Sequence, residues 1–224
     1  MSLGPCPYET ALQAHWSKAT ESARDSATDS AHDLAHIRRV WANCQHIAKG
    51  EGQNATVDLE LLHAAALFHD LVNLPKNAPN RAEASRLSAE AAAPLARACG
   101  LPEAKLPALK HAIAAHSFSA KIAPQTLEAQ ILQDADRLDA LGAIGLARML
   151  MISGALNRPL YDHTDPLAQN RAPDDTAFAL DHFQTKLFTL ADTMHTETAR
   201  QIATERTTYM RAFLARLHSE IAET

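Results

Sequence analysis

Apolar residues recur along most of this chain at steps of three and four, the spacing that one face of an α-helix presents. Between residues 32 and 52, the positions that keep this spacing are Leu34, Ile37, Val40, Trp41, Cys44 and Ile47. Gly50 and Gly52 follow, and glycine is the residue that most often ends a helix. The pattern therefore predicts a helix that stops at this pair of glycines.

The same reasoning predicts helices along the rest of the chain. A second helix is predicted over 57–75, with Asp58 as its N-cap and Pro75 as its terminator. Further helices are predicted over roughly 80–99, 103–117, 126–141, 143–156, 174–194 and 195–222, while 157–174, with three prolines, is predicted to be one long loop. Neither the segment before this loop nor the segment after it looks able to fold as a domain on its own. We therefore expect an all-α fold and a single domain over 1–224, with the metal ligands in 33–140 and C-terminal helices in 175–222.

Composition narrows the functional classes. The chain of 224 residues has only 7 glycines, a formal net charge of −5 and no cluster of Lys and Arg, so we expect no nucleic-acid partner. No segment reads as a signal peptide or as a membrane helix of about 18 apolar residues, so a cytoplasmic protein without a membrane partner is expected. Cys6, Cys44 and Cys99 form no CxxC pair and indicate neither a disulfide framework nor a zinc knuckle.

Four residues on separate predicted helices suggest a metal site. His69 and Asp70 are adjacent on one helix, His36 lies one helix earlier, and Asp136 lies two helices later. Two imidazoles and two carboxylates suit Mn, Fe, Co, Ni or Zn better than Ca or Mg. Adjacent helix residues point about 100° apart, so the ion must sit off the helix edge with neighbouring helices completing its shell. An ionised Asp70 within "AAALFHDLV" would be costly unless it were paired or bound to a metal.

The order His, His-Asp, Asp resembles the HD-domain phosphohydrolase superfamily and, more closely, its YedJ-type bacterial members. The matching stretches are "DLAHIRRVW" (33–41), "LFHDLVNLPKNAPNRAEAS" (67–85), "HAIAAHSFSA" (111–120), "TLEAQILQDADRLDALGAIGLAR" (126–148) and "DHFQTKL" (181–187). The resemblance implies a helical bundle with a central metal cleft and one divalent ion, Mn first and Fe, Co, Ni, Zn or Mg as alternatives. It also implies hydrolysis of a phosphoester or phosphoanhydride bond in a small phosphorylated compound, with nucleotides the first class to test.

The resemblance carries over to individual residues. The implied metal ligands are His36, His69, Asp70 and Asp136; the residues expected to take part in catalysis are Asp70, His116 and Asp139; those expected to bind substrate are Asn73, Lys76, Arg81 and Lys186. Asn73 stands where several nucleotide-cleaving relatives carry a Glu that activates water, and an amide is no general base. The base is then water activated by the metal itself, Asp139, or a residue not identified.

Each of these assignments has a simpler structural alternative. Lys76 reads equally as a solvated loop cation, Arg81 as a helix cap or ion-pair partner, and Lys186 as a surface helix residue. His116 follows an apolar run and could be a buried, hydrogen-bonded histidine rather than a group that protonates a leaving oxygen or contacts phosphate. His63 lies two turns before Asp70 and fits a core role or a second metal.

Three other functions stay open on the sequence alone. The first is a non-catalytic sensor that binds a nucleotide in the same site. The second is a di-iron oxygenase, which would need more His and carboxylate ligands than the four clear ones. The third is a structural scaffold without a site, which would leave the His-Asp pair unexplained. A homo-oligomer also stays open, because the apolar "IGLARMLMISGAL" over 144–156 could serve either a subunit contact or the core.

Overall fold

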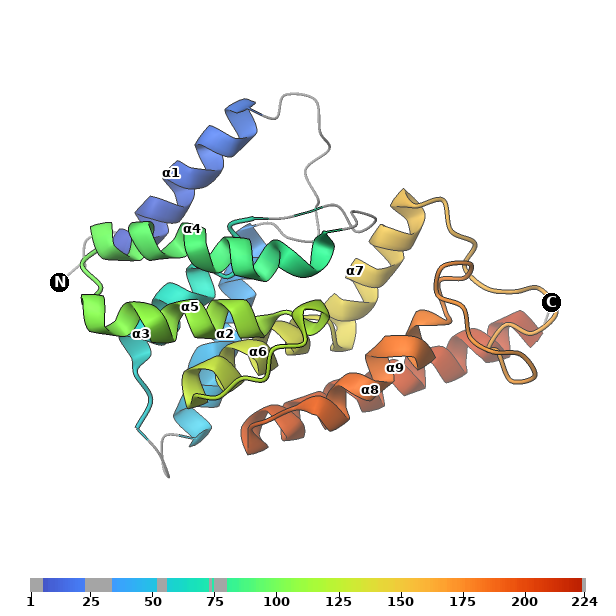
Figure 1. Ribbon diagram of the computed structural model, residues 1–224. Helices are drawn as coiled ribbons and strands as arrows, with labels where there is room; N and C mark the ends of the chain where they lie inside the picture. The colour runs from blue at the N-terminus through green and yellow to red at the C-terminus, as the bar shows by residue number, and fades with distance from the viewer. Residues whose placement is uncertain (1–5, 23–33, 52–55, 73, 75–79, 223–224) are drawn as a thin grey trace. The chain divides into compact units, whose positions relative to one another are not determined.

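The computed structural model describes residues 6–22, 34–51, 56–72, 74 and 80–222. Within these ranges the chain forms helices joined by turns and loops and contains no strand, so the predicted all-α class is confirmed (Figure 1). No single helix among them is long and apolar enough to cross a membrane, although the bent pair of α6 (Leu127–Asp139) and α7 (Gly142–Ala155) passes that test when taken together. Cytoplasmic location stays a prediction.

The chain divides into two compact units, Met1–Asp136 and Arg137–Thr224. The first holds α1 (Pro7–Ser22), α2 (Leu34–Glu51), α3 (Leu59–Phe68), α4 (Ala84–Ala98), α5 (Leu106–His116) and most of α6. The second holds α7, α8 (Phe188–Leu190) and α9 (Glu197–Ala222). That both belong to one domain stays a prediction.

In the first unit, α4 and α5 lie side by side, and α3 packs against both α2 and α5 (Figure 1). The fully buried side chains between these helices are large and aliphatic or aromatic, among them Ile37, Ile47, Leu62, Phe68, Leu109 and Ile113. Each comes from a helix predicted from apolar spacing, and α2 occupies the range expected for it. The helix α1 was not predicted, and it contributes Tyr8 and Leu12 to the core.

The helix α3 begins as predicted and ends early. Asp58 caps it by accepting a hydrogen bond from the backbone N–H of Leu61 at 3.1 Å. The last helical residue is Phe68 rather than a residue next to Pro75, so placing the His69-Asp70 pair inside a helix was wrong. After this end, the hydroxyl of Ser88 on α4 accepts a hydrogen bond from the backbone N–H of Val72 at 3.0 Å.

In the second unit, α7 packs against α9, and both lie close to their predicted ranges. The predicted helix over 174–194 was wrong: the segment consists of turns, a π-helical turn (Phe183–Leu187), α8 and a 3₁₀ turn (Ala191–Thr193). The backbone N–H groups of Ala179 and Leu180 bond to the carbonyls of Pro159 and Leu160 at 3.0 and 2.9 Å. Donors used in this way cannot form helical bonds.

The stretch 157–174 is a loop without regular elements, as predicted. Its end is fixed by the buried carboxylate of Asp181, which accepts two hydrogen bonds from the guanidinium of Arg171 and one from the backbone N–H of Asp174 at 2.6 Å. Asp162 and Asp165 accept further backbone N–H groups within the loop. Side-chain carboxylates thus satisfy the backbone of this loop in place of a helical ladder.

Candidate metal centre

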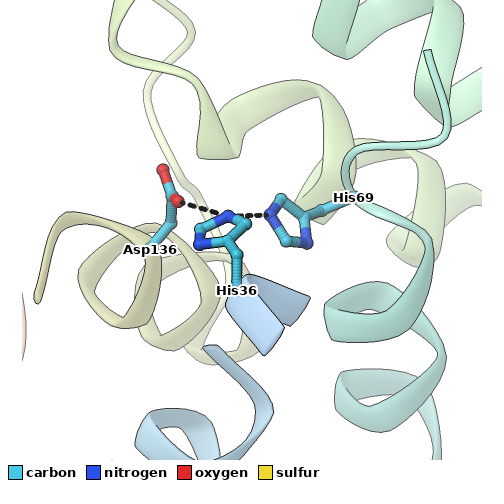
Figure 2. Close-up of side chains that lie close together, drawn as sticks. All are labelled: His36, His69 and Asp136. Carbon is cyan, nitrogen blue, oxygen red and sulfur yellow. Dashed lines mark hydrogen bonds and ion pairs between the residues drawn. The ribbon is translucent and has the colours of Figure 1, made fainter. Parts of the chain in front are cut away.

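Three of the predicted ligands converge from three elements of the first unit. His36 comes from α2, His69 follows the end of α3, and Asp136 comes from α6. Figure 2 shows the ring of His36 between the other two, with Nε2 of His36 lying 3.4 Å from Nε2 of His69 and 3.5 Å from Oδ1 of Asp136. The three donor atoms lie within 4.8 Å of one another, a spacing that could hold a metal ion.

Asp70 joins this group through one oxygen of its carboxylate. Its Oδ2 lies 3.6 Å from Nε2 of His69 and 3.7 Å from Nε2 of His36. The pair comes directly after Phe68, the last residue of α3, and His69 itself keeps right-handed helical backbone angles.

The same carboxylate also meets a fifth donor, His116 at the end of α5. Nε2 of His116 lies 3.5 Å from Oδ1 of Asp70, and the rings of His69 and His116 meet edge to face with centroids 4.8 Å apart. His69, Asp70 and His116 form a second group of donor atoms within 4.8 Å of one another. Sequence reasoning placed His116 at the site for proton transfer or phosphate contact, and the geometry brings it against Asp70, a predicted ligand.

Backbone carbonyls orient two of the imidazoles. Nδ1 of His69 lies 2.8 Å from the carbonyl oxygen of Ala66, and Nδ1 of His116 lies 2.6 Å from that of Ile113. A carbonyl only accepts, so in both rings Nδ1 carries a proton, and in His69 the lone pair of Nε2 faces the cluster. His69 therefore has the tautomer that a metal-binding histidine needs, and the donor set fits a divalent ion.

Burial and charge keep the donors in their binding forms. Burial lowers the pKa of His69 to about 4, so this ring is neutral at pH 7. Burial by itself would raise the pKa of Asp70, but the nearby imidazoles, that of His69 foremost, hold it well below its usual value. The pKa of Asp136 is lowered against burial in the same way, chiefly by His36. Burial opposes the raised pKa of His116, and its bond to Asp70 outweighs that effect.

The site is open on its carboxylate side. The side chains of Asp70 and Asp136 keep 18% and 30% of their surface exposed, whereas those of His36, His69 and His116 keep 6% or less. A ligand from solvent can therefore reach the carboxylates while protein surrounds the imidazoles.

Two amide side chains that sequence reasoning missed fix the helices that carry these donors. Asn43, two turns after His36 on α2, donates to the carbonyl of Ala135 at 3.1 Å, next to Asp136. Gln133, one turn before Asp136, donates to the carbonyl of Ala115 at 2.5 Å, next to His116. The sequence does show that Asn43 and Gln133 stand at helical spacing from the predicted ligands His36 and Asp136. It does not show which backbone carbonyls they bond to.

The predicted phosphate-binding residues are less well placed by the structure. Asn73 and Lys76 lie outside the described residues. Arg81 starts a short 3₁₀ turn and donates to the backbone carbonyl of Leu74. Lys186 is half-buried in the π-helical turn of the second unit. Their roles toward substrate stay predictions.

Asp139 and His63 have other partners. The carboxylate of Asp139, in the second unit, is buried and accepts a hydrogen bond from the guanidinium of Arg148. The ring of His63 stacks on Trp41 with centroids 4.2 Å apart, and its Nδ1 lies 3.9 Å from Sγ of Cys6. His63 belongs to neither donor group, which favours the core role over a second metal. The catalytic role of Asp139 stays a prediction.

Comparison with known proteins points to one family. The HD domain model matches residues 33–141, a span that contains all five donor residues. The uncharacterized protein YpgQ of Bacillus subtilis strain 168 is 34% identical over 190 residues, which cover 83% of this chain and 82% of YpgQ.

Solved structures give the same result. The crystal structure of Bacillus subtilis YpgQ in complex with ADP matches with a TM-score of 0.70 and 30% identity, covering 96% of this chain and 94% of that one. An HD-superfamily hydrolase from Bacillus thuringiensis matches with a TM-score of 0.68 and 28% identity, covering 97% and 100%. A protein from Lactobacillus plantarum matches with a TM-score of 0.69 and 30% identity, covering 96% and 99%.

Proposed function

The chain belongs to the HD-domain superfamily, and on that premise we propose that it is a metal-dependent phosphohydrolase whose substrate is a small phosphorylated compound, with nucleotides as the first class to test. Its likeness to an HD-superfamily hydrolase across nearly the whole of both chains supports the hydrolase part. The YedJ-type subgroup and the phosphorylated substrate belong to the proposal.

The observation that carries the proposal is the donor cluster itself. His36, His69, Asp70 and Asp136 would hold one divalent ion, and a mixed set of imidazoles and carboxylates suits manganese first, with Fe, Co, Ni, Zn or Mg as alternatives. Bound there, such an ion would lower the pKa of a coordinated water and polarise a phosphoryl oxygen.

The protein's own groups supply the rest of the chemistry. Ionised Asp70 and Asp136 face the solvent-open side, where a phosphate would approach. His116, protonated at Nε2, would contact a phosphate oxygen or give its proton to the leaving oxygen as the phosphorus–oxygen bond breaks. The carboxylate of Asp139 is already bonded to Arg148, so water activated at the metal is the base that we favour.

A nucleotide is favoured because of a relative. The YpgQ complex contains ADP, and the match to YpgQ extends over most of both chains. Arg81, Lys76 and Lys186 are the cations that we propose for the phosphate groups, as the resemblance implied. Developing negative charge in phosphoryl transfer is stabilised by such cations.

The test is a screen of nucleoside mono-, di- and triphosphates and simple phosphoesters against Mn, Co, Ni, Mg and Zn. The expected result is metal-dependent release of phosphate or pyrophosphate, which Asp70→Ala abolishes. Asp192→Ala, which removes an exposed carboxylate from the turn Ala191–Thr193, is the matched control and should leave the rate unchanged. Activity that survives Asp70→Ala would overturn the proposed site.

A second candidate is a non-catalytic nucleotide sensor, favoured by the fact that the YpgQ structure holds ADP as a bound ligand. Tight binding of nucleotides by the metal-loaded protein, with no release of phosphate or pyrophosphate in the screen, would select the sensor over the hydrolase.

A further inference from the structure

Two cysteines that are far apart in the chain lie together in the first unit. Cys6 immediately precedes α1, and Cys99 is the C-cap of α4. The thiol of Cys99 donates a hydrogen bond to the carbonyl of Pro7, the residue next to Cys6, at 3.4 Å. Figure 1 shows the first turn of α1 beside the end of α4, against which it packs. The fold thus brings together two thiols that no CxxC spacing indicated.

Both of these thiols can be reached from solvent. Cys6 and Cys99 are free and partly exposed, whereas the third cysteine of the chain, Cys44, is fully buried. Burial foremost, and then negative charge on Cys6, raises the pKa of the Cys99 thiol, so the two sulfurs lie within electrostatic range of each other. A small disulfide in solution can therefore meet Cys6 and Cys99 but not Cys44.

The surroundings of Cys6 suit reaction at its sulfur. Nδ1 of His63 lies 3.9 Å from Sγ of Cys6. Burial lowers the pKa of His63, so this ring is neutral at pH 7 and can hydrogen-bond the sulfur as a thiol or as a thiolate. Cys6 also stands at the N-terminus of α1, where the helix dipole favours negative charge. An imidazole and a helix N-terminus are typical neighbours of cysteines that attack disulfides.

We propose that Cys6 and Cys99 form a redox-active thiol pair that a small disulfide such as oxidised glutathione converts to an internal disulfide between α1 and the end of α4. The Cys6 thiolate attacks the small disulfide, forms a bond to one glutathione sulfur and releases the other glutathione as a thiolate. The Cys99 thiolate then attacks Sγ of Cys6 and releases the second glutathione. Two protein thiols are oxidised, one small disulfide is reduced, and the two protons lost by the cysteines pass to the two leaving thiolates.

The helix α1 connects this thiol pair to the metal centre. Nε2 of His15 on α1 lies 3.4 Å from the carbonyl oxygen of Leu71, the residue after Asp70. A bond from Cys6 to the end of α4 closes a long loop, which restricts the unfolded chain and favours the folded one. The oxidised protein is therefore expected to hold α1 on the first unit more firmly than the reduced protein does.

The experiment treats the folded, reduced, full-length protein with excess oxidised glutathione, stops the exchange with acid, and measures the intact mass and the disulfide-linked peptides. The wild type should lose two of its three thiols, carry no glutathione and yield a peptide linked through Cys6 and Cys99. Cys99→Ser should stop at the first step, with one glutathione on Cys6. Buried Cys44 is the internal control and should keep its thiol. The oxidised wild type should unfold at a higher urea concentration than the reduced one, and Cys99→Ser should lack this shift.

Three results would overturn the thiol pair. One is a wild type with glutathione on both Cys6 and Cys99 and no internal bond, since the two sulfurs would then not reach each other. The others are a wild type that keeps all three thiols and a linked peptide that contains Cys44. The wild-type result does not depend on whether a variant folds. Hydrolysis is measured separately in the nucleotide screen, so failure of the proposed function leaves the thiol pair standing.

Discussion

Nε2 of His36 and Nε2 of His69 face each other at 3.4 Å, although His36 lies on α2 and His69 follows the end of α3. Nε2 of His69 is an acceptor, because Nδ1–H of the same ring donates a hydrogen bond to the carbonyl of Ala66. Without an ion, the pair is compatible with one hydrogen bond from His36; with an ion, both lone pairs would point at it. The first prediction is therefore that stability depends on metal.

Metal should raise the free energy of unfolding, because the ion binds the folded cluster and not the separated side chains of the unfolded chain. At a Mn²⁺ concentration 100 times Kd the expected gain is about 2.7 kcal/mol at 25 °C. His36→Ala removes the ring between His69 and Asp136, so this gain should vanish at the same concentration. Denaturant unfolding with and without Mn²⁺ measures it.

The matched control for this variant is His46→Ala, which removes an exposed histidine from the same helix. It should keep the whole gain. A gain that persists in His36→Ala would place the ion elsewhere and contradict the centre described here.

Asn43 and Gln133 should matter for metal affinity without touching the ion. Each holds a carbonyl next to a donor residue, and loss of such supporting partners typically costs 10–100-fold in metal affinity. Asn43→Ala and Gln133→Ala should each raise the Mn²⁺ dissociation constant by about that factor, as measured by calorimetric titration. Gln130→Ala, on α6 like Gln133, removes a 3.5 Å hydrogen bond to the carbonyl of Pro124 and should leave the dissociation constant within about twofold.

How far the site could be predicted depends on what carries the information. His36, His69, Asp70 and Asp136 could be named because residue type and order along the chain are visible in the sequence. The carbonyls of Ala66 and Ile113 could not, because every residue has one and only the path of the backbone selects which meets a ring. The contact between Asp70 and His116 also depends on where two helices end.

The fold shows the same limit. Apolar spacing located α2 and α9 well, because their burial follows from the local pattern of their own residues. It failed over 174–194, where the backbone donors of Ala179 and Leu180 pair with carbonyls about twenty residues earlier in the chain. The apolar spacing within a short segment carries no information about hydrogen bonds to distant residues. A helix was therefore expected where the structure has turns.

Two glycines of α7 should respond to alanine with opposite signs. A Cβ on Gly145 would lie 2.1 Å from the carbonyl oxygen of Ala140, a backbone atom that cannot move away without distorting the entry to the helix. A Cβ on Gly154 would meet nothing within 4 Å. Alanine is favoured over glycine in helices by up to about 1 kcal/mol, so Gly154→Ala should stabilise the protein by roughly that amount.

Gly145→Ala should instead destabilise it by about 1–3 kcal/mol, as inserted atoms do in a tightly packed place. Thermal or denaturant unfolding of the two variants beside the wild type measures both signs. Equal stabilisation by the two substitutions would mean that the approach of Ala140 to α7 is looser than the structure has it.

The loop 157–174 should lose a stabilising charge in acid. The hydroxyl of Thr164, and then the backbone N–H groups of Asp165 and Thr164, donate to Oδ1 of Asp162 and lower its pKa to about 2. The unfolded value is about 3.9. Because the folded pKa is the lower one, the ionised carboxylate stabilises the folded state above about pH 4, and this contribution is lost as pH falls toward 2.

Asp162→Asn mimics the protonated carboxyl, so the wild type should be the more stable protein at pH 6, and the difference should shrink between pH 4 and pH 2 and vanish below pH 2. Urea unfolding of both proteins across that range measures the difference, which cancels the titration of every other carboxylate. Asp192→Asn, at an exposed position outside the loop, should show no comparable pH dependence. A difference that stays constant down to pH 2 would show that the three hydrogen bonds stabilise the neutral and the ionised side chain equally. The charge of Asp162 would then contribute nothing to the stability of the loop.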